Sequence, residues 1–289
     1  MTSQLPSWFR QEIPDREVLE NMRTFSENNV HTVCQEAHCP NITRCFKSNS
    51  FTFMILGNAC TRNCAFCAVN KDRGEKLFLD QEEPERICHI VERFKLDYVV
   101  ITSVTRDDLE DGGAVHFART IKLIHGLNTG IAVEALIPDF QGKIESLKFL
   151  LASGPLVLAH NLETVKRLYC NLRPEADYKL SLDLLSIVKK ISPGILTKSS
   201  IMLGLGEIES EILEAMRDLR IADCDLLVLG QYLAPSALHY PVREFISLKQ
   251  FKKYEDMAVG MGFKAVLSGP LVRSSYRAKE TYRGILCMI

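Results

Sequence analysis

The sequence predicts an α/β fold, a full or partial β/α barrel with extensions at both ends of the chain. Short apolar runs alternate with longer amphipathic stretches, the composition is that of an ordinary globular protein, and 289 residues is a usual length for such barrels. Lys+Arg number 35 and Asp+Glu 36, so the net charge of −1 gives no sign of binding to nucleic acid or to an anionic membrane. We find no candidate membrane span or targeting leader and expect a cytoplasmic protein.

Short apolar runs are the predicted strands. They are often β-branched and frequently end near Gly, Pro or Asn, as buried strands do. In chain order they are Phe51–Leu56, Tyr98–Val104, Ile131–Leu136, Leu156–Ala159, Ser200–Leu203, Leu226–Gly230 and a further candidate, Ala265–Ser268.

Amphipathic stretches between these runs are the predicted helices. In Glu82–Phe94, for example, Ile87 and Val91 fall on one helical face. Strands about 25–45 residues apart, each followed by a helix, indicate parallel β/α units whose functional site lies at the C-terminal ends of the strands. The other predicted helices are Val115–Ile124, Gly142–Leu151, Leu180–Ile191, Glu209–Ile221 and Leu248–Gly260.

No repeat, low-complexity tract or linker divides the chain, so we expect one integrated domain. Its predicted parts are an N-terminal extension at 1–50, a barrel at 51–263 and a C-terminal segment at 264–289. The extension is expected to be irregular and to carry the first cysteines.

Six of the ten cysteines lie between Cys34 and Cys67. A disulfide framework suits neither this chain length nor the lack of a secretory signal, so the cluster indicates a metal site in a reducing compartment. Cys60, Cys64 and Cys67, the later triplet, follow the first predicted strand with C-x3-C-x2-C spacing. Three thiolates can hold three irons of a 4Fe–4S cluster and leave one iron open to a small molecule. A structural zinc ion is the alternative, but no fourth Cys or His lies next to this triplet.

Cys34, Cys39 and Cys45, the earlier triplet, have C-x4-C-x5-C spacing. Taken alone, this spacing is open between an iron–sulfur cluster and zinc, with His38 as a fourth zinc ligand. Six thiolates are too many for one shared zinc ion. We expect the other four cysteines to be ordinary small residues of the core or tail: Cys88, Cys170, Cys224 and Cys287.

Together the two triplets resemble those of the lipoyl synthase family, within the radical S-adenosylmethionine (SAM) superfamily. The similarity extends over nearly the whole chain, although Ser200 and Ala159 stand where the family has Gly and Asn. Its further motifs are TSVTRDDLEDGGAVHFA from Thr102, EALIPDFQG from Glu134, HNLETV from His160, RPEADY from Arg173, LGLGE from Leu203, GQYLAPS from Gly230 and GPLVRSSY from Gly269.

This resemblance implies a partial (β/α)6-type radical SAM barrel and a sulfurtransferase of lipoate biosynthesis that uses SAM and two 4Fe–4S clusters. It would insert two sulfur atoms at C6 and C8 of an octanoyl chain that is amide-linked to a lysine of a carrier protein. Those carbons bear unactivated C–H bonds, so a radical route is needed and the cofactor supplies it. In the family, SAM bound to the cluster of the later triplet is cleaved to a 5′-deoxyadenosyl radical. The auxiliary cluster, here on the earlier triplet, supplies sulfur and is consumed.

The resemblance also gives the auxiliary cluster a serine ligand from the RSSY motif. This role falls on Ser275, with Ser274 as the alternative, although a polar turn after a strand would use the same residues. A serine oxygen is a harder ligand than a thiolate and matches an iron–sulfur cluster poorly. We therefore expect the iron that this serine would bind to be the labile one of the auxiliary cluster.

Several residues that follow a predicted strand or the last cysteines are candidate SAM contacts. For each, loop packing, a salt bridge or a helix cap is the alternative role. The acidic run at Asp107, Asp108 and Asp111 is expected to serve a loop and a helix start rather than a divalent ion. The candidates are Phe66 for the adenine, Asn161 and Glu163 for the ribose, Arg173 for the methionine carboxylate, and Ser103, with Thr102, for the amino group.

Two basic stretches flank the proposed site. Residues Asn41–Arg73 and Lys264–Arg283 each hold five Lys or Arg against one acidic residue. They would dock an acidic carrier domain or else offset the charge of the clusters and SAM. The family implies octanoylated carrier domains as partners, in 2-oxoacid dehydrogenase acyltransferase subunits and the glycine cleavage H protein. It also implies an electron donor such as flavodoxin or ferredoxin, and iron–sulfur carrier proteins.

Three other classes of protein would share some of these features. Another radical sulfur-inserting enzyme would have the later triplet but not the earlier one with RSSY. An iron–sulfur electron carrier would fit the cysteines but would not need the β/α units. A zinc-structured binding module would be colourless and would release zinc.

Overall fold

Eight strands form one sheet in the order β1-β2-β5-β6-β7-β8-β9-β10 in the computed structural model, which describes residues 5–71, 77–128 and 130–287. From β2 onward neighbouring strands of this sheet are parallel, as the repeated β/α pattern predicts. These strands are β2 (Thr52–Ile55), β5 (Tyr98–Ser103), β6 (Ala132–Leu136), β7 (Val157–Ala159), β8 (Leu196–Leu203), β9 (Leu226–Gln231) and β10 (Ala265–Gly269).

Each predicted strand is present, but β8 begins at Leu196 rather than at Ser200. The residues between these two positions are polar, and polarity hid them from the hydrophobic pattern. Thr197, Lys198 and Ser199 are nevertheless buried, because each side chain has a hydrogen-bond partner.

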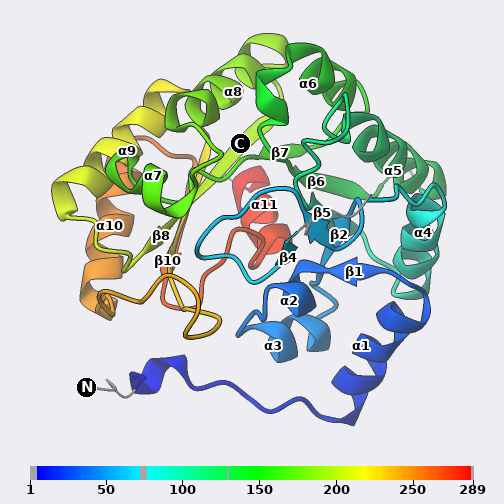
Figure 1. The fold of residues 1–289 in the computed structure, drawn as a ribbon, viewed down its shortest axis with the longest axis horizontal. Coiled ribbons are helices and arrows are strands. Elements are labelled where there is room, and N and C mark those ends of the chain that lie inside the picture. Colours follow the sequence, from blue (N-terminus) through cyan, green and yellow to red (C-terminus); the bar gives the residue numbers. More distant parts are fainter. Residues whose placement is uncertain (1–4, 72–76, 129, 288–289) are drawn as a thin grey trace.

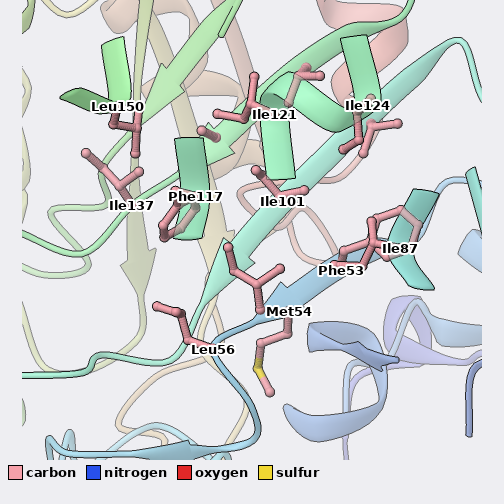
Figure 2. Close-up of a cluster of buried hydrophobic side chains, with 14 of the residues drawn as sticks. Phe53, Met54, Leu56, Ile87, Ile101, Phe117, Ile121, Ile124, Ile137 and Leu150 are labelled. Carbon is pink, nitrogen blue, oxygen red and sulfur yellow. The ribbon is translucent and has the colours of Figure 1, made fainter. Parts of the chain in front are cut away.

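Amphipathic helices form an arc outside the strands (Figure 1). Figure 2 shows how they are held: Phe53 of β2 and Ile101 of β5 pack with Ile87 of α4 and with Phe117 and Ile121 of α5. Burial of such side chains is the main stabilising contribution to this fold. The helices are α4 (Glu83–Arg93), α5 (Ala114–Leu127), α6 (Ile144–Leu151), α8 (Tyr178–Ile191), α9 (Glu209–Ile221) and α10 (Leu248–Gly260), and all six were expected.

The expectation that residues 1–50 are irregular is wrong. Helix α1 (Arg16–Glu27) packs Phe25 against Phe51, with ring centroids 4.6 Å apart, and β1 (His31–Thr32) pairs antiparallel with β2. Val18, Met22 and Phe25 lie on one face of this helix, but it stands outside the alternation of strands and helices from which the other helices were predicted. A cap at Asp15, whose side chain accepts from Val18 N at 3.0 Å, was a further signal. Two short helices follow, α2 (Val33–Glu36) and α3 (Ile42–Lys47).

A C-terminal helix that the sequence pattern did not predict, α11 (Ala278–Leu286), lies inside the arc of strands (Figure 1). Tyr282 packs on Tyr98 and Ile285 on Val157 and Leu226, which are the first residues of β5, β7 and β9. The helix therefore covers the N-terminal ends of the strands, and it leaves their C-terminal ends for the site.

Short elements complete the described chain: η1 (Ser7–Phe9), β3 (Ala59–Cys60), β4 (Asn70–Lys71), η2 (Phe140–Gly142), η3 (Lys166–Leu168) and α7 (Tyr169–Leu172). None of the helices in the described ranges combines the length and the apolar character that a membrane crossing requires.

Candidate active site

A cavity of about 460 Å³ lies at the C-terminal ends of the strands, where a β/α barrel carries its site. Its wall brings together residues from the extension, the barrel and the C-terminal segment. A larger hollow of about 860 Å³ lies between the starts of α5 and α6 and contains none of the expected site residues. The expected site residues Cys60 and Cys64 are not part of the wall of the 460 Å³ cavity. The expected residues that line it are Cys34, Cys39, Cys45, Phe66, Cys67, Thr102, Ser103, Asn161, Glu163, Ser274 and Ser275.

The later triplet sits on the loop that follows β2. Cys60 lies in β3, and its Sγ accepts the backbone N–H groups of Arg62 and Thr105, each at 3.4 Å. Burial raises the pKa of Cys64 to about 11, Arg173 opposes this shift, and the Cys67 and Cys60 thiols add to it. The three thiols therefore lie close enough to affect one another's ionisation.

The earlier triplet comes from the two short helices of the extension and the turn between them. A hydrogen bond with Cys45, together with burial, raises the pKa of Cys34 well above its ordinary value. Burial also raises the pKa of Cys39, while the Arg273 guanidinium opposes the shift. This arginine is the first residue of the RSSY motif, so the C-terminal segment places a cation beside the earlier triplet.

Each triplet offers the donor set of an iron–sulfur cluster. Each supplies three thiol donors, as a 4Fe–4S cluster with one further ligand requires. In the part of the chain that the structure describes, no three Cys, His, Asp or Glu side chains converge as ligands of a single ion. His38 lines the cavity but completes no such group.

A hydrogen-bonded chain links the RSSY motif to the end of β7. Ser274 Oγ donates to Asn161 Oδ1 at 2.8 Å, and Asn161 Nδ2 donates to Glu163 Oε1 at 2.9 Å. Glu163 has a φ of 68°, a strained conformation that is typical of functional positions. Burial raises the pKa of this carboxyl group, and Arg173 and Asn161 oppose the shift.

Ser275 differs from its neighbour. Within the described ranges its hydroxyl has no hydrogen-bond partner, and the residue lines both the site cavity and a second cavity of about 220 Å³. Ser103 Oγ is likewise buried without a partner, whereas Thr102 Oγ1 donates to Leu136 O at 3.1 Å. Ser275 and Ser103 are therefore the two of these hydroxyls that are available to a ligand.

Arg173 is not part of the cavity wall. Its Nη1 donates to Asn161 O at 3.2 Å and to Tyr169 OH at 3.0 Å, and the guanidinium stacks on the Tyr169 ring. It therefore supports the strand end that carries Asn161, while its charge acts on Cys64. Its Nε is buried without a partner in the described part of the chain.

The acidic run has the structural role expected of it. Asp111 accepts from Gly113 N at 2.9 Å and from Val115 N at 2.7 Å, at the start of α5. Asp108 pairs with Arg106 at 2.7 Å and Asp107 with Arg62 at 2.7 Å. Each of the three carboxylates thus has a backbone or arginine partner in the described part of the chain.

Sequence reasoning missed the groups that fix the cysteine loop. Arg62 lies inside the later triplet and pairs with two carboxylates. Glu83 accepts from the backbone of Leu56 at 2.8 Å and Gly57 at 3.2 Å, just before the cysteines, and lies 2.7 Å from His116 Nε2. Arg62 stands between two cysteines and His116 within the motif from Thr102, whereas Glu83 lies in the predicted helix Glu82–Phe94 and had no such signal.

Comparison with known proteins decides the family. The family model described as "Radical SAM superfamily" matches residues 54–219. The lipoyl synthase of Caldanaerobacter subterraneus subsp. tengcongensis is 52% identical over 279 residues, which cover 96% of this chain and 97% of that protein. The lipoyl synthase of Thermus thermophilus is 50% identical, over 96% of this chain and 86% of that protein. The chain belongs to the lipoyl synthase family.

Solved structures agree on the fold of this family member. Methylornithine synthase has a TM-score of 0.53 at 15% identity, over 96% of this chain and 89% of that one. The FeFe-hydrogenase maturase HydG from Carboxydothermus hydrogenoformans has a TM-score of 0.54 at 12% identity, over 81% and 65%. At these identities the likeness concerns the fold alone, a radical SAM α/β barrel. As a lipoyl synthase, the enzyme is a sulfurtransferase that uses SAM and two 4Fe–4S clusters.

Proposed function

We propose that this enzyme inserts two sulfur atoms into a protein-bound octanoyl-lysine, at C6 and C8, within the cavity at the C-terminal ends of the strands. The observation that carries the proposal is the meeting of the earlier triplet, Cys67 of the later triplet and the RSSY motif around this one cavity. The thiols of Cys60 and Cys64 lie close to that of Cys67 behind the cavity wall. When bound, SAM and the two clusters supply a radical that removes hydrogen from unactivated C–H bonds and the sulfur that replaces it.

In this proposal the later triplet holds the cluster that binds SAM, and the polar residues at the strand ends hold SAM itself. Phe66 offers a ring to the adenine, and Ser103 a free hydroxyl. Asn161 and Glu163 form a pre-bonded pair that would receive the ribose hydroxyls. Arg173 would act by its charge and by holding Asn161, because its guanidinium is already bonded to the backbone there.

An apolar part of the same wall suits the octanoyl chain. It is formed by Val33, Met54, Leu136 and Met202, from the extension and from three strands. Such a wall excludes water and places an alkyl chain between the two triplets. Ser200, which stands where the family has Gly, also lines the cavity and narrows it by one hydroxymethyl group.

The earlier triplet and Ser275 would hold the auxiliary cluster. Ser275 is favoured over Ser274 because the Ser274 hydroxyl is already bonded to Asn161. Arg273, beside Cys39, would offset the negative charge of this cluster.

Ser275→Ala is therefore expected to lower the yield of lipoyl product strongly, while Ser274→Ala has a smaller effect through Asn161. Ser275→Cys is expected to build a more stable cluster that donates sulfur less readily, since a thiolate matches iron better than an alkoxide does. Iron content and lipoyl yield per chain, measured side by side for the three variants, test this. Normal yield from both Ser275 variants would exclude the serine as a ligand.

The substrate carrier is expected to be a lipoyl domain, which delivers its acylated lysine to the cavity. Many of the cations in the two basic stretches are already paired: Lys47 with Glu12, and Lys279 and Arg283 with Asp97. Arg44 and Arg277 remain exposed. They meet at Tyr276: Arg44 donates to its hydroxyl at 3.0 Å, and the Arg277 guanidinium lies over its ring. Among the described residues, Arg44 forms no ion pair with a carboxylate.

We expect Arg44 and Arg277 to contact the acidic surface of the carrier. The double variant Arg44→Ala/Arg277→Ala is expected to weaken carrier binding about two- to tenfold, because exposed pairs contribute little individually. Binding is also expected to weaken as salt is added. Titrations at two salt concentrations, with Lys179→Ala on the far helix α8 as the control, test this. Salt-independent binding, unchanged in the double variant, would contradict it.

The proposed reaction also requires a reductant for the SAM-binding cluster and a source of iron and sulfur to rebuild the auxiliary cluster. A small electron-transfer protein such as flavodoxin or ferredoxin would reduce the SAM-binding cluster, and iron–sulfur carrier proteins would restore the auxiliary cluster.

The direct test is anaerobic reconstitution with iron and sulfide, followed by dithionite, SAM and an octanoyl-lysyl peptide. Mass spectrometry should detect 5′-deoxyadenosine together with a peptide that has gained two sulfur atoms. 5′-Deoxyadenosine without sulfur gain would keep the radical chemistry and argue against either this substrate or the auxiliary cluster. No SAM cleavage by a cluster-replete sample would favour an electron carrier instead.

A further inference from the structure

Arg62, between the first two cysteines of the later triplet, is bound by two carboxylates from different loops. Its Nε and Nη2 donate to Asp107 at 2.7 and 3.1 Å, after β5. Its Nη1 and Nη2 donate to Asp139 at 2.6 Å each, after β6. Four charge-assisted hydrogen bonds therefore join three loops at one guanidinium.

This group is buried rather than a surface pair. The Arg62 side chain is 6% exposed and that of Asp139 1%. Burial raises the pKa of Asp139, but the Arg62 guanidinium outweighs it and holds the pKa below its usual value. In such a setting the loss of one partner leaves a buried, uncompensated charge, which is far more costly than the loss of an exposed pair.

The same clamp brings a hydrogen-bond donor to a cysteine. Thr61, next to Arg62, donates through N and Oγ1 to Thr105 O, each at 3.0 Å, and Asp107 N donates to Thr61 Oγ1 at 3.0 Å. Held in this way, Thr105 N lies 3.4 Å from Cys60 Sγ. The position of Cys60 thus depends on how closely the β5 loop lies against the cysteine loop.

We propose that Arg62 is the positioning residue of the later triplet. Arg62 does not line the cavity. It fixes the cysteine loop against the loops after β5 and β6, so that Cys60, Cys64 and Cys67 are pre-arranged before any cluster is present. The inference rests on the proposed function only in taking the later triplet to be a cluster-binding site. The pre-arrangement itself is a property of the cluster-free chain.

The test measures the thiols directly in the cluster-free protein. Wild type, Arg62→Lys and Arg62→Gln are pulsed with iodoacetamide, and the rate at each cysteine is read by peptide mass spectrometry. The alkylation rate of the later triplet is expected to be lowest in wild type, higher in Arg62→Lys and highest in Arg62→Gln. In Arg62→Gln the rate is expected to rise at least about tenfold, because local opening of the cysteine loop becomes easier. The earlier triplet, in the same molecules, is expected to stay within about twofold of wild type.

A matched control separates positioning from general stability. Lys198→Met breaks another buried ion pair, Lys198–Glu134, in the barrel interior away from the cavity wall. It is expected to lower the melting temperature while leaving the ratio between the two triplets unchanged. Equal acceleration of both triplets in Arg62→Gln, the same selective rise in Lys198→Met, or no change in either Arg62 variant would each overturn the proposal. If Arg62→Gln does not fold, Arg62→Lys, which keeps a charge between the two aspartates, supplies the result. All of these outcomes are read without turnover, so they are distinct from a failure of the sulfur-insertion test.

Discussion

Cys39→Ala is expected to cleave SAM and add no sulfur, whereas Cys64→Ala is expected to do neither. Cys39 lines the cavity, and Cys64 lies beside Cys67, which lines it too. The two thiols belong to different triplets, so each variant removes one cluster while the other three-cysteine set remains. Changes to groups behind metal ligands already cost about 10–100-fold in affinity or activity. Loss of a ligand itself is therefore expected to exceed that range for the step that depends on it.

Anaerobic turnover with an octanoyl-lysyl peptide separates the two effects, because 5′-deoxyadenosine reports SAM cleavage and peptide mass reports sulfur gain. Cys170→Ala is the control, since Cys170 is an exposed cysteine of α7 that does not line the cavity. Sulfur gain by Cys39→Ala would contradict the role of the earlier triplet. SAM cleavage by Cys64→Ala would contradict that of the later one.

The fold was predictable wherever burial leaves a regular trace in the sequence. Strands such as β5 and β9 are continuous apolar runs, and α4 has a clear apolar face. The start of β8 was missed because the barrel buries polar groups there in pairs. Helices α1 and α11 also have an apolar face, but they lie outside the alternation of strands and helices that guided the prediction.

The site was predictable where its ligands are neighbours in sequence. The spacing of the two triplets is local, so the cysteines could be found from the sequence, and the earlier triplet and Cys67 do line one cavity. The Arg62 clamp could not be found in this way, because Asp107 and Asp139 lie 45 and 77 residues away. Likewise, the distinction between Ser274 and Ser275 depends on Asn161, which lies 113 residues from Ser274.

Lys198→Met is expected to lower the free energy of unfolding by about 3–5 kcal/mol, the usual cost of breaking a buried ion pair from one side. Lys198 Nζ lies 2.7 Å from Glu134 Oε1, and both side chains are 2% exposed. Tyr98 OH donates to the other carboxylate oxygen at 2.9 Å. Without the lysine, Glu134 must remain ionised and unpaired in the barrel or take up a proton.

The double variant Lys198→Met/Glu134→Leu distinguishes the cost of the stranded charge from the value of the pair. Replacing both partners by apolar side chains of similar volume is often neutral, so the double variant is expected to recover most of the lost stability. Urea unfolding of the cluster-free proteins measures both differences. If the double variant is as unstable as Lys198→Met, the pair itself, with its bond to Tyr98, stabilises the barrel. If Lys198→Met unfolds like wild type, Glu134 is not buried as the structure places it. In either case the cavity is unaffected, since neither residue lines it.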